Sequence, residues 1–307
     1  MNRGRVIING ATGFIGRPLT SSLAQAGYEV VVLTRNPGKA TGLFGERIRT
    51  AVWDGRTSGG WLELASGARA IINLAGENIG AGRWTPKKKG AIIRSRLDAG
   101  HAVVEAVRQA RAKPNVLIQA SAVGYYGSRA GEELDESSPQ GGGFLAGLVQ
   151  EWEGSTAEAE NFGVRRVVIR SGLVLDSDGG VLPRFLRQFR SFAGGPLGSG
   201  RQWVSWIHRQ DEVLAIRFLL EREDLAGVFN LAAPQPLTMK EFARTLGREM
   251  HRPALFRVPA VVLRLFLGEM AEETILVGQR VVPRALLRAD FEFHYPRLES
   301  ALREILR

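Results

Sequence analysis

The sequence predicts an α/β fold in which a doubly wound parallel sheet carries helices on both faces. Two observations predict it. Residues 6–16 form an apolar run that ends in a glycine-rich turn and leads directly into a helical stretch, residues 17–27. After that, strand-like and helix-like segments alternate through the first two-thirds of the chain. Such alternation is typical of βαβ units, whose right-handed crossovers join parallel strands.

The elements follow in order along the chain. The segment 91–112 repeats apolar residues at intervals of three and four, which predicts an amphipathic helix, and residues 144–162 are consistent with another. Six strands are predicted, at residues 5–10, 29–34, 48–54, 70–76, 115–122 and 165–172.

Two irregular segments interrupt the alternation. Residues 125–143 follow the fifth strand, at the edge where ligands bind to such sheets. Residues 179–212, rich in glycine and tryptophan, are expected to cover the substrate side. From about residue 253 onward the chain has helical segments separated by prolines. We therefore expect a main domain at 1–250 that includes the 179–212 segment, and a small, mainly helical C-terminal domain at 251–307.

The composition argues against several classes of protein. The 307 residues include no cysteine, so disulfides, thiolate nucleophiles and zinc–thiolate sites are excluded, and four scattered histidines predict no metal site. The longest apolar stretch, residues 258–268, is too short to cross a membrane and is interrupted by Arg264. The first strand begins too early to leave room for a signal peptide, so a cytoplasmic protein is expected. The net charge of +10 is dispersed, which argues against nucleic-acid binding.

The turn after the first strand has the spacing of a dinucleotide-phosphate site. Gly10 stands where the chain must turn sharply, Gly13 where backbone must approach a pyrophosphate, and Gly16 where the helix must pack closely on the strand. The pyrophosphate would lie on the N-terminus of the helix, where unpaired N–H groups and the helix dipole favour an anion. The remaining cofactor residues predicted in this turn are Thr12, Phe14 and Ile15.

The end of the second strand indicates which dinucleotide is bound. Sites for NAD carry an acidic residue there, which binds the adenosine ribose. This chain has Thr34 and Arg35 instead, and the guanidinium offers a fork of donors that suits a 2′-phosphate. Lys39 would add positive charge. We therefore expect NADP(H) as cofactor, the alternative being an arginine that is simply solvated.

The third and fourth strands end in further candidates. Asp54 could accept a hydrogen bond from the adenine amine, although aspartate is also common in turns. The fourth strand ends in Asn73, Leu74, Ala75 and Gly76, and the small residues there would let the strand end lie beneath the adenosine. Among the basic residues that follow, Arg96 is favoured over Arg94 for contact with a phosphate or ribose.

Several longer strings resemble one known family. The strings are NLAGENIGAGRW (73–84), SRLDAG (95–100), SAVGYYG (121–127), GGPLGSGRQWVSWIH (194–208) and FEFHYPRLESAL (291–302). With the glycine turn, they make the chain similar to the extended short-chain dehydrogenase/reductases. More narrowly, it resembles the atypical epimerase-like branch that includes bacterial YfcH-type proteins and human family member 39U. The resemblance implies a Rossmann-type domain and a C-terminal domain of unassigned role. It also implies NADP(H) held partly by Thr34, Arg35, Leu74, Ala75 and Arg96.

The chain departs from that superfamily at the catalytic pair. Typical members carry YxxxK, in which the lysine lowers the pKa of an acid/base tyrosine. Here the two positions fall near Gly147 and Glu151. Ser121 with Tyr125 or Tyr126 could supply the hydroxyls instead; alternatively, the two tyrosines only pack the loop and wall the pocket. His208 and Asp211 could form a catalytic pair, but structural or substrate-contact roles are expected for them.

Two functions from different classes are consistent with these features. The first is an NADP(H)-dependent epimerase or oxidoreductase that acts on an unknown small molecule. The second is a non-catalytic NADP(H)-binding sensor or scaffold, which the missing YxxxK pair favours and which a link of similar proteins to cell division suggests. The sequence is compatible with a monomer or a homodimer.

Overall fold

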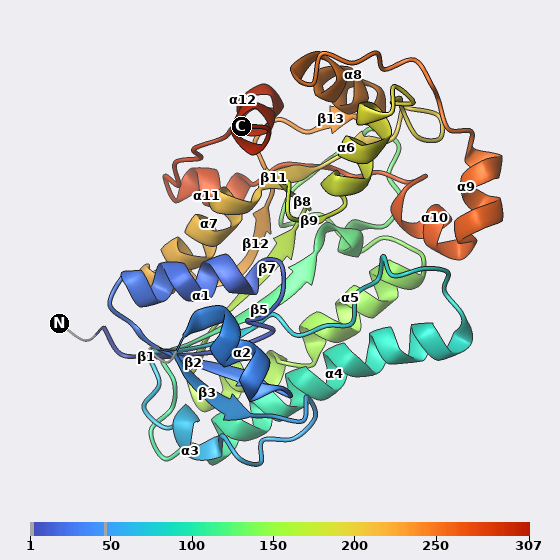
Figure 1. The fold of residues 1–307 in the computed structure, drawn as a ribbon. Helices are drawn as coiled ribbons and strands as arrows, with labels where there is room; N and C mark the ends of the chain where they lie inside the picture. The colour runs from blue at the N-terminus through green and yellow to red at the C-terminus, as the bar shows by residue number, and fades with distance from the viewer. Residues whose placement is uncertain (1–2, 46–47) are drawn as a thin grey trace.

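A seven-stranded parallel sheet forms the centre of the computed structural model, which describes residues 3–45 and 48–307 (Figure 1). Its order places β1 between β2 and β4, and the chain passes from β1 to β2 and β3 on one side and then returns to β4 on the other. This arrangement is the switch point at which doubly wound sheets bind ligands. In spatial order the strands are β12 (Gly227–Leu231), β7 (Arg165–Ser171), β5 (Val116–Ala122), β4 (Ala70–Asn73), β1 (Arg5–Asn9), β2 (Glu29–Thr34) and β3 (Arg49–Val52). All six predicted strands are confirmed; the edge strand β12 was not predicted.

Helices cover both faces of the sheet because successive strand residues point to opposite sides. Val6 and Ile8 of β1 pack into a core with α1 (Gly16–Gln25) and α7 (Arg209–Glu221), whereas Ile7 packs into a second core with α4 (Pro86–Gln109). The predicted doubly wound α/β fold is thus confirmed. Helix α2 (Pro37–Phe44) packs on the α1 side, whereas α3 (Leu62–Ala65) and the 3₁₀ helix η2 (Ala157–Phe162) pack on the α4 side.

The two predicted long helices differ from expectation at their ends. Helix α4 begins five residues early, because the Thr85 hydroxyl accepts a hydrogen bond from the Lys88 N–H at 3.1 Å and Pro86 occupies the first helical position. The predicted helix 144–162 is divided into α5 (Phe144–Gly154) and η2. At the break the Ser155 side chain lies against Gly100 of α4, where a Cβ would meet it at 2.0 Å.

The segment predicted to cover the substrate side forms two small sheets around helix α6 (Leu182–Arg190). One has the order β11 (Trp206–His208), β8 (Leu173–Asp176), β9 (Gly179–Gly180), and the other pairs β10 (Trp203–Val204) with β13 (Leu237–Thr238). After β5 the chain forms the 3₁₀ helix η1 (Val123–Tyr126) and the short strand β6 (Glu133–Leu134).

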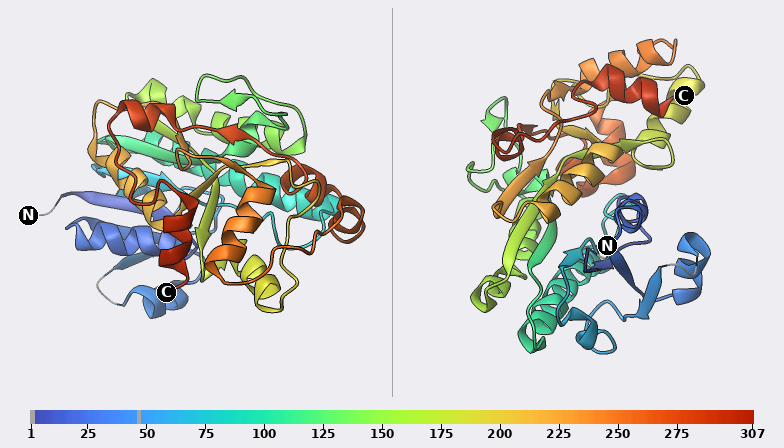
Figure 2. Two further views of the ribbon diagram at one scale, coloured as in Figure 1. Left: turned by 90° about the horizontal axis from the view of Figure 1, so that it is seen from above. Right: turned by 90° about the vertical axis from the view of Figure 1, so that its left-hand side faces the viewer.

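The C-terminal region is mainly helical, as predicted, and lies on the side of the molecule opposite β2 and β3 (Figure 2). It packs onto the rest of the chain through several cores: one around Leu298 and Leu302, one around Met270, one that includes Val281, and the sheet core, to which Leu286 and Phe291 belong. The boundary predicted at residue 250 stays a prediction. The elements are α8 (Met239–Glu249), α9 (Ala260–Leu267), α10 (Glu269–Thr274), β14 (Arg280–Val281), α11 (Arg284–Arg288) and α12 (Leu298–Ile305). No helix in the described ranges is long and apolar enough to span a bilayer.

Polar contacts also tie this region to the main sheet and its helices. The Glu273 carboxylate of α10 accepts a hydrogen bond from the Leu145 N–H at 3.0 Å, and so caps the N-terminus of α5. Lys89 of α4 forms an ion pair with Glu269 at 2.7 Å. On the other side, the Asp211 carboxylate of α7 accepts hydrogen bonds from the backbone N–H groups of His294 and Tyr295, each at 2.9 Å.

The glycine turn between β1 and α1 brings backbones closer than any side chain would allow. Gly10 has φ +71°, and a Cβ there would lie 2.6 Å from the Leu74 carbonyl oxygen at the end of β4. At Gly16 a Cβ would lie 2.3 Å from the Gly10 carbonyl oxygen. Gly16 therefore lets α1 begin directly against the turn.

Glu212 of α7 is completely buried, and only one of its oxygens has a partner among the described residues, the Ser171 hydroxyl. Burial raises the pKa of this carboxyl to about 8. The folded chain therefore keeps a proton that an unfolded chain releases near pH 4.5.

Replacing Gly16 with alanine should destabilise the fold by about 1–3 kcal/mol, because the added methyl overpacks rigid backbone. The matched control is Gly42→Ala in α2, where a Cβ meets nothing within 4 Å. That change should be neutral or stabilising by up to about 1 kcal/mol. Urea unfolding of both variants checks this, and equal effects would contradict the assignment of Gly16 to a close contact.

The contribution of Glu212 to stability should fall as pH rises from about 4.5 to about 8, because over this window the folded state binds a proton at Glu212 that the unfolded state lacks; below about pH 6.5 buried His208, whose pKa is lowered to about 4, acts in the opposite sense. The contribution is at most about 1.4 kcal/mol per pH unit. Glu212→Gln should remove this pH dependence, so the free energy of unfolding of the variant should rise relative to that of the parent as pH rises. The exposed Glu292→Gln is the control; chemical unfolding at several pH values that gives parallel curves for all three proteins would refute the prediction.

Candidate nucleotide site

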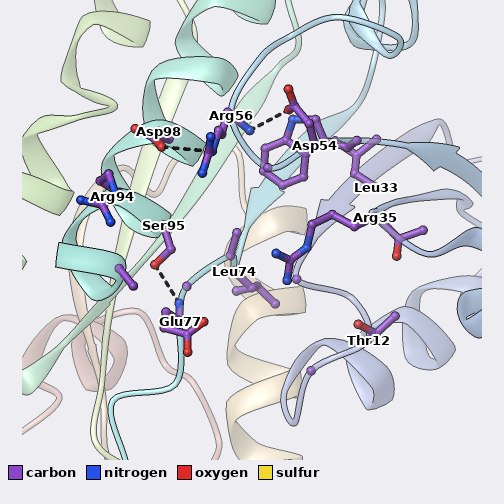
Figure 3. A pocket seen from close by; sticks show the side chains of 18 residues that line it. Thr12, Leu33, Arg35, Asp54, Arg56, Leu74, Glu77, Arg94, Ser95 and Asp98 are labelled. Atoms are coloured by element: carbon purple, nitrogen blue, oxygen red, sulfur yellow. Dashed lines mark hydrogen bonds and ion pairs between the residues drawn. The ribbon is translucent and has the colours of Figure 1, made fainter. Parts of the chain in front are cut away.

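A cavity of about 430 Å³ opens at the carboxyl ends of β1, β2, β3 and β4, facing the first half of α4 (Figure 3). This is the edge at which ligands bind to doubly wound sheets. It is lined by Gly10, Thr12, Gly13, Leu33, Thr34, Arg35, Trp53, Asp54, Gly55, Arg56, Leu74, Ala75, Gly76, Glu77, Ala91, Arg94, Ser95 and Asp98.

The turn that predicted the site forms one wall of this cavity. Gly10, Thr12 and Gly13 line it, while Gly16 lies beneath the turn. Helix α1 has no side chain that caps its first turn, although the Arg17 N–H already donates to the Gly13 carbonyl at 3.1 Å and Pro18 has no N–H. An anion there would be favoured mainly by the positive end of the helix dipole. The buried Asn9 fixes the opposite wall, since its side-chain oxygen accepts hydrogen bonds from the Leu74 and Ala75 N–H groups at 2.8 and 3.2 Å.

Phe14 and Ile15, also predicted to bind the cofactor, are not among the lining residues of this cavity. The Phe14 ring instead packs on Gly179 of β9, where a Cβ would meet it at 2.4 Å. The Arg209 guanidinium lies 5.1 Å from the centre of the same ring. Phe14 therefore joins the glycine turn to the segment that was predicted to cover the substrate side.

Arg35 extends over the cavity from the end of β2, and Figure 3 shows its guanidinium directed toward Leu74. Among the described residues nothing pairs with this guanidinium. The turn that presents it is well ordered by hydrogen bonds: Thr34 Oγ1 accepts from the Asn36 N–H at 3.1 Å, and Asn36 Oδ1 caps α2 through the Lys39 N–H at 3.0 Å. The arrangement leaves the Arg35 guanidinium without a partner, as far as the structure describes the chain, at the end of β2 where a dinucleotide ribose would lie.

Asp54 lies in the cavity wall, but its oxygens serve the local turn. They accept hydrogen bonds from the N–H groups of Arg56 and Thr57 and from the Thr57 hydroxyl, at 2.8–2.9 Å. These hydrogen bonds lower the pKa of the Asp54 carboxyl, and those from the backbone N–H groups contribute most. The same turn places Arg56 at the cavity mouth, with Nε 3.8 Å from the Asp98 carboxylate of α4.

Besides Glu77 in the loop after β4, sequence reasoning passed over the polar lining residues Arg56, Ser95 and Asp98, and it ranked Arg94 behind Arg96. Arg56 had a signal, since it follows the carboxyl end of a predicted strand. Arg94, Ser95 and Asp98 lie on α4, and only the rotation of that helix selects them over their neighbours. Ser95 also holds the loop after β4, because its Oγ accepts a hydrogen bond from the Glu77 N–H at 2.8 Å.

Arg96, the basic residue favoured for the cofactor, is not among the lining residues of this cavity, although its guanidinium lies against Gly76, which is. Its guanidinium is buried against the Trp152 ring, 4.7 Å from the ring centre, and donates hydrogen bonds to the Glu77 and Ile92 carbonyls at 3.1 Å. Burial lowers its pKa to about 10. In this structure Arg96 supports the loop after β4 from below.

The residues predicted for catalysis belong to a buried polar network centred on Arg170 of β7. Arg170 donates two hydrogen bonds to the Glu153 carboxylate of α5, at 2.8 and 2.9 Å, and one to the Tyr126 hydroxyl at 3.1 Å. The Ser121 hydroxyl donates to the same carboxylate. Tyr126 in turn donates to Asn230 Oδ1 at 2.7 Å.

The two tyrosines have different environments within this network. Tyr126 has no exposed surface, and burial raises its pKa to about 12. Tyr125 is half-buried, its ring covers the Arg170 guanidinium at 3.4 Å, and its hydroxyl has no hydrogen-bond partner among the described residues. Of the two phenols, only that of Tyr125 is free to act on a ligand.

The positions expected for a catalytic tyrosine and lysine carry no such groups. Gly147 of α5 faces open space, and Glu151 is exposed to solvent. His208 and Asp211 do not pair with each other. His208 Nδ1 accepts a hydrogen bond from the Gln210 N–H at 3.1 Å and caps α7, while Asp211 anchors the loop before α12.

The chain matches two known family models and is similar in sequence to known proteins. The family model described as the NAD-dependent epimerase/dehydratase family matches residues 6–232, and a domain of unknown function, DUF1731, matches residues 258–305. A chloroplastic SDR39U1 homolog of the epimerase family from Arabidopsis thaliana is 41% identical over 98% of this chain and 86% of its own length. Epimerase family protein YfhF of Bacillus subtilis is 37% identical over 98% of this chain and 97% of its own.

A solved structure agrees with these sequence matches. The crystal structure of the human epimerase family protein SDR39U1 with NADPH has a TM-score of 0.88 and 33% identity, over 98% of both chains. The predicted resemblance is therefore confirmed, and so is a nicotinamide dinucleotide as the cofactor class of the family. The chain belongs to the NAD-dependent epimerase/dehydratase family, with SDR39U1-like relatives and a C-terminal DUF1731 region.

Proposed function

We propose that this protein binds NADP(H) and catalyses an oxidoreductase or epimerase reaction on a small molecule in the cytoplasm. The observation that carries the cofactor choice is the free guanidinium of Arg35 at the end of β2, in a cavity with no carboxylate at that position. A 2′-phosphate is a dianion that needs a cation there, whereas the ribose of NAD needs an acceptor. The NADPH in the human relative's crystal supports the same choice.

The lining residues fit the parts of this cofactor. The pyrophosphate would lie on Gly10, Gly13 and the uncapped N-terminus of α1. The adenosine would lie over Leu74, with Arg35 and Arg56 at either side of its ribose phosphate. The bound cofactor would supply or take up a hydride, and the protein's part is to orient it and to move a proton.

Tyr125 is the proposed proton donor. Its hydroxyl is unpartnered, and Arg170 fixes the ring from one face while Glu153 holds Arg170 from behind. Ser121 and Tyr126 are committed to the buried network and act as positioning residues in this proposal. A phenol next to a paired guanidinium can donate a proton to a substrate oxygen without an adjacent lysine.

A second candidate is an NADP(H)-binding sensor or scaffold without turnover. The specific observation that favours it is the same network, because it consumes the Ser121 and Tyr126 hydroxyls, and helix α5 offers only Gly147 and the exposed Glu151 where the superfamily has its catalytic pair. Nucleotide binding is common to both candidates, so the measurement that separates them is turnover.

Arg35→Asp should weaken NADPH binding by about 100-fold, since it removes a charge-assisted contact worth roughly 1.5–3 kcal/mol and adds a repulsive charge. NADH binding should change by less than about threefold. Arg201→Asp, an exposed substitution outside the cavity, controls for net charge. Titration calorimetry with both cofactors measures the four affinities. Equal losses for NADPH and NADH would show that Arg35 does not bind the 2′-phosphate.

Purified protein should oxidise NADPH with at least one member of a panel of aldehydes, ketones and nucleotide sugars. Tyr125→Phe should then lower kcat by about 100-fold or more while leaving the melting temperature near that of the parent. Tyr126→Phe should lower stability instead, because it leaves buried Asn230 and Arg170 groups unpaired. Tight NADPH binding without turnover of any substrate would favour the sensor.

A further inference from the structure

A second cavity of about 440 Å³ lies on the side of α1 that faces α7 and α12. Four separate segments enclose it: α1, the end of β8, the start of α7 and the last helix of the chain. It shares no lining residue with the nucleotide cavity. A hollow as large as the first, built from segments so far apart in sequence, is of the size that small-molecule sites have.

His208 gives this cavity a polar group that is nearly buried and unused. Its side chain is 5% exposed, and its ring stacks on Tyr295 at 4.0 Å. Nδ1 accepts the capping hydrogen bond of α7, whereas Nε2 has no partner among the described residues. Burial lowers the pKa of the imidazole to about 4, so the ring is neutral at physiological pH. With Nδ1 acting as acceptor, the proton resides on Nε2, which becomes a donor toward the cavity.

Carboxylates and hydroxyls provide acceptors and further donors around this imidazole. Asp176 lines the cavity and is paired with Arg209 at 2.8 Å, and Glu304 is paired with Arg307 at 3.1 Å. Each carboxylate keeps free lone pairs although its charge is largely compensated. Ser22 and Ser177 add hydroxyls to the lining.

The rest of the lining is Arg209, which is paired with Asp176 and Asp178, Gln210, and a set of aliphatic side chains. Pro18, Val213, Leu214 and Ile305 contribute aliphatic surface beside the polar groups. The lining thus combines hydrogen-bond donors and acceptors with aliphatic surface against which the C–H groups of a ligand could pack. Its carboxylates are paired with arginines.

We propose that this cavity is a second binding site, for a neutral polyhydroxylated molecule such as a sugar or a cyclitol. Each hydroxyl both donates and accepts, so it can accept from His208 Nε2 and donate to Asp176 or Glu304 in the same pose. An anion offers only acceptors and would face two carboxylates, while the one guanidinium in the described lining, that of Arg209, is already paired with Asp176 and Asp178. A cation offers only donors and would face the N–H of His208.

The test uses the full-length protein with methyl α-D-glucopyranoside and myo-inositol as probes, choline and citrate as charged alternatives, and titration calorimetry with saturation-transfer NMR as readouts. At least one of the two neutral probes should bind with a dissociation constant on the order of 1 mM or lower. Binding of choline or citrate in their place, or of none of the four, would overturn the proposal.

Two variants locate the binding. Ser22→Phe fills the cavity and is matched by Ser21→Phe on the exposed side of the same helix. His208→Asn keeps an oxygen that can cap α7 but removes the Nε2 donor, and exposed His251→Asn is its control. Each cavity variant should weaken the neutral probe at least about tenfold, and each control should not.

NADPH binding in the same samples reports that the variants are folded, since the nucleotide cavity shares no lining residue with this one. A sugar that binds Ser22→Phe and His208→Asn as well as it binds the parent occupies another place, such as the substrate side of the cofactor, and would also overturn the proposal.

Discussion

The close approach of two backbones at the ends of β1 and β4 is the constraint on which the nucleotide site depends. Gly10 lies against the Leu74 carbonyl, and Asn9 accepts hydrogen bonds from the two N–H groups that follow β4. Because no side chain separates these strand ends, the turn before α1 and the loop after β4 form one continuous surface. The cavity, the uncapped helix and the supporting Arg96 all take their positions from that surface.

The buried ion pair between Arg170 and Glu153 organises the other half of the molecule. Both side chains are withdrawn from solvent, at 4% and 12% exposure, and the pair is satisfied by hydrogen bonds on every side. A buried charge that lost its partner would be costly, so this geometry is rigid. The structure therefore places a fixed polar network beside helix α5, on which the catalytic pair was expected, and Tyr125, whose hydroxyl has no partner among the described residues, lies at the edge of that network.

The sequence predicted the parts of the fold that depend on local patterns. Alternating strands and helices, the glycine turn and the strand-end positions of Arg35, Asp54 and Leu74 follow from periodicity and from the geometry of parallel sheets. The edge strand β12 was missed because its five residues, GVFNL, are too short and mixed to stand out between two helices.

Long-range contacts account for what the sequence did not predict. Arginine is a residue type that often binds phosphate, but the Arg96 guanidinium packs on the ring of Trp152, which lies more than fifty positions further along the chain. Tyr125 and Tyr126 are adjacent and chemically identical, yet only partners on β7 and β12 decide which hydroxyl is buried. Rotation of α4 likewise selects Arg94 and Asp98 for the cavity.

The cap on α5 has a consequence for the order in which the protein is assembled during translation. The N–H of Leu145 is paired with the carboxylate of Glu273, 128 positions further along the chain, and the ion pair of Lys89 with Glu269 spans 180 positions. The strands and glycine turn of the nucleotide site are complete long before these partners leave the ribosome. The half of the molecule that holds the cofactor is thus made first. Helix α5 receives the cap on its N-terminus only when nearly nine-tenths of the chain has been synthesised.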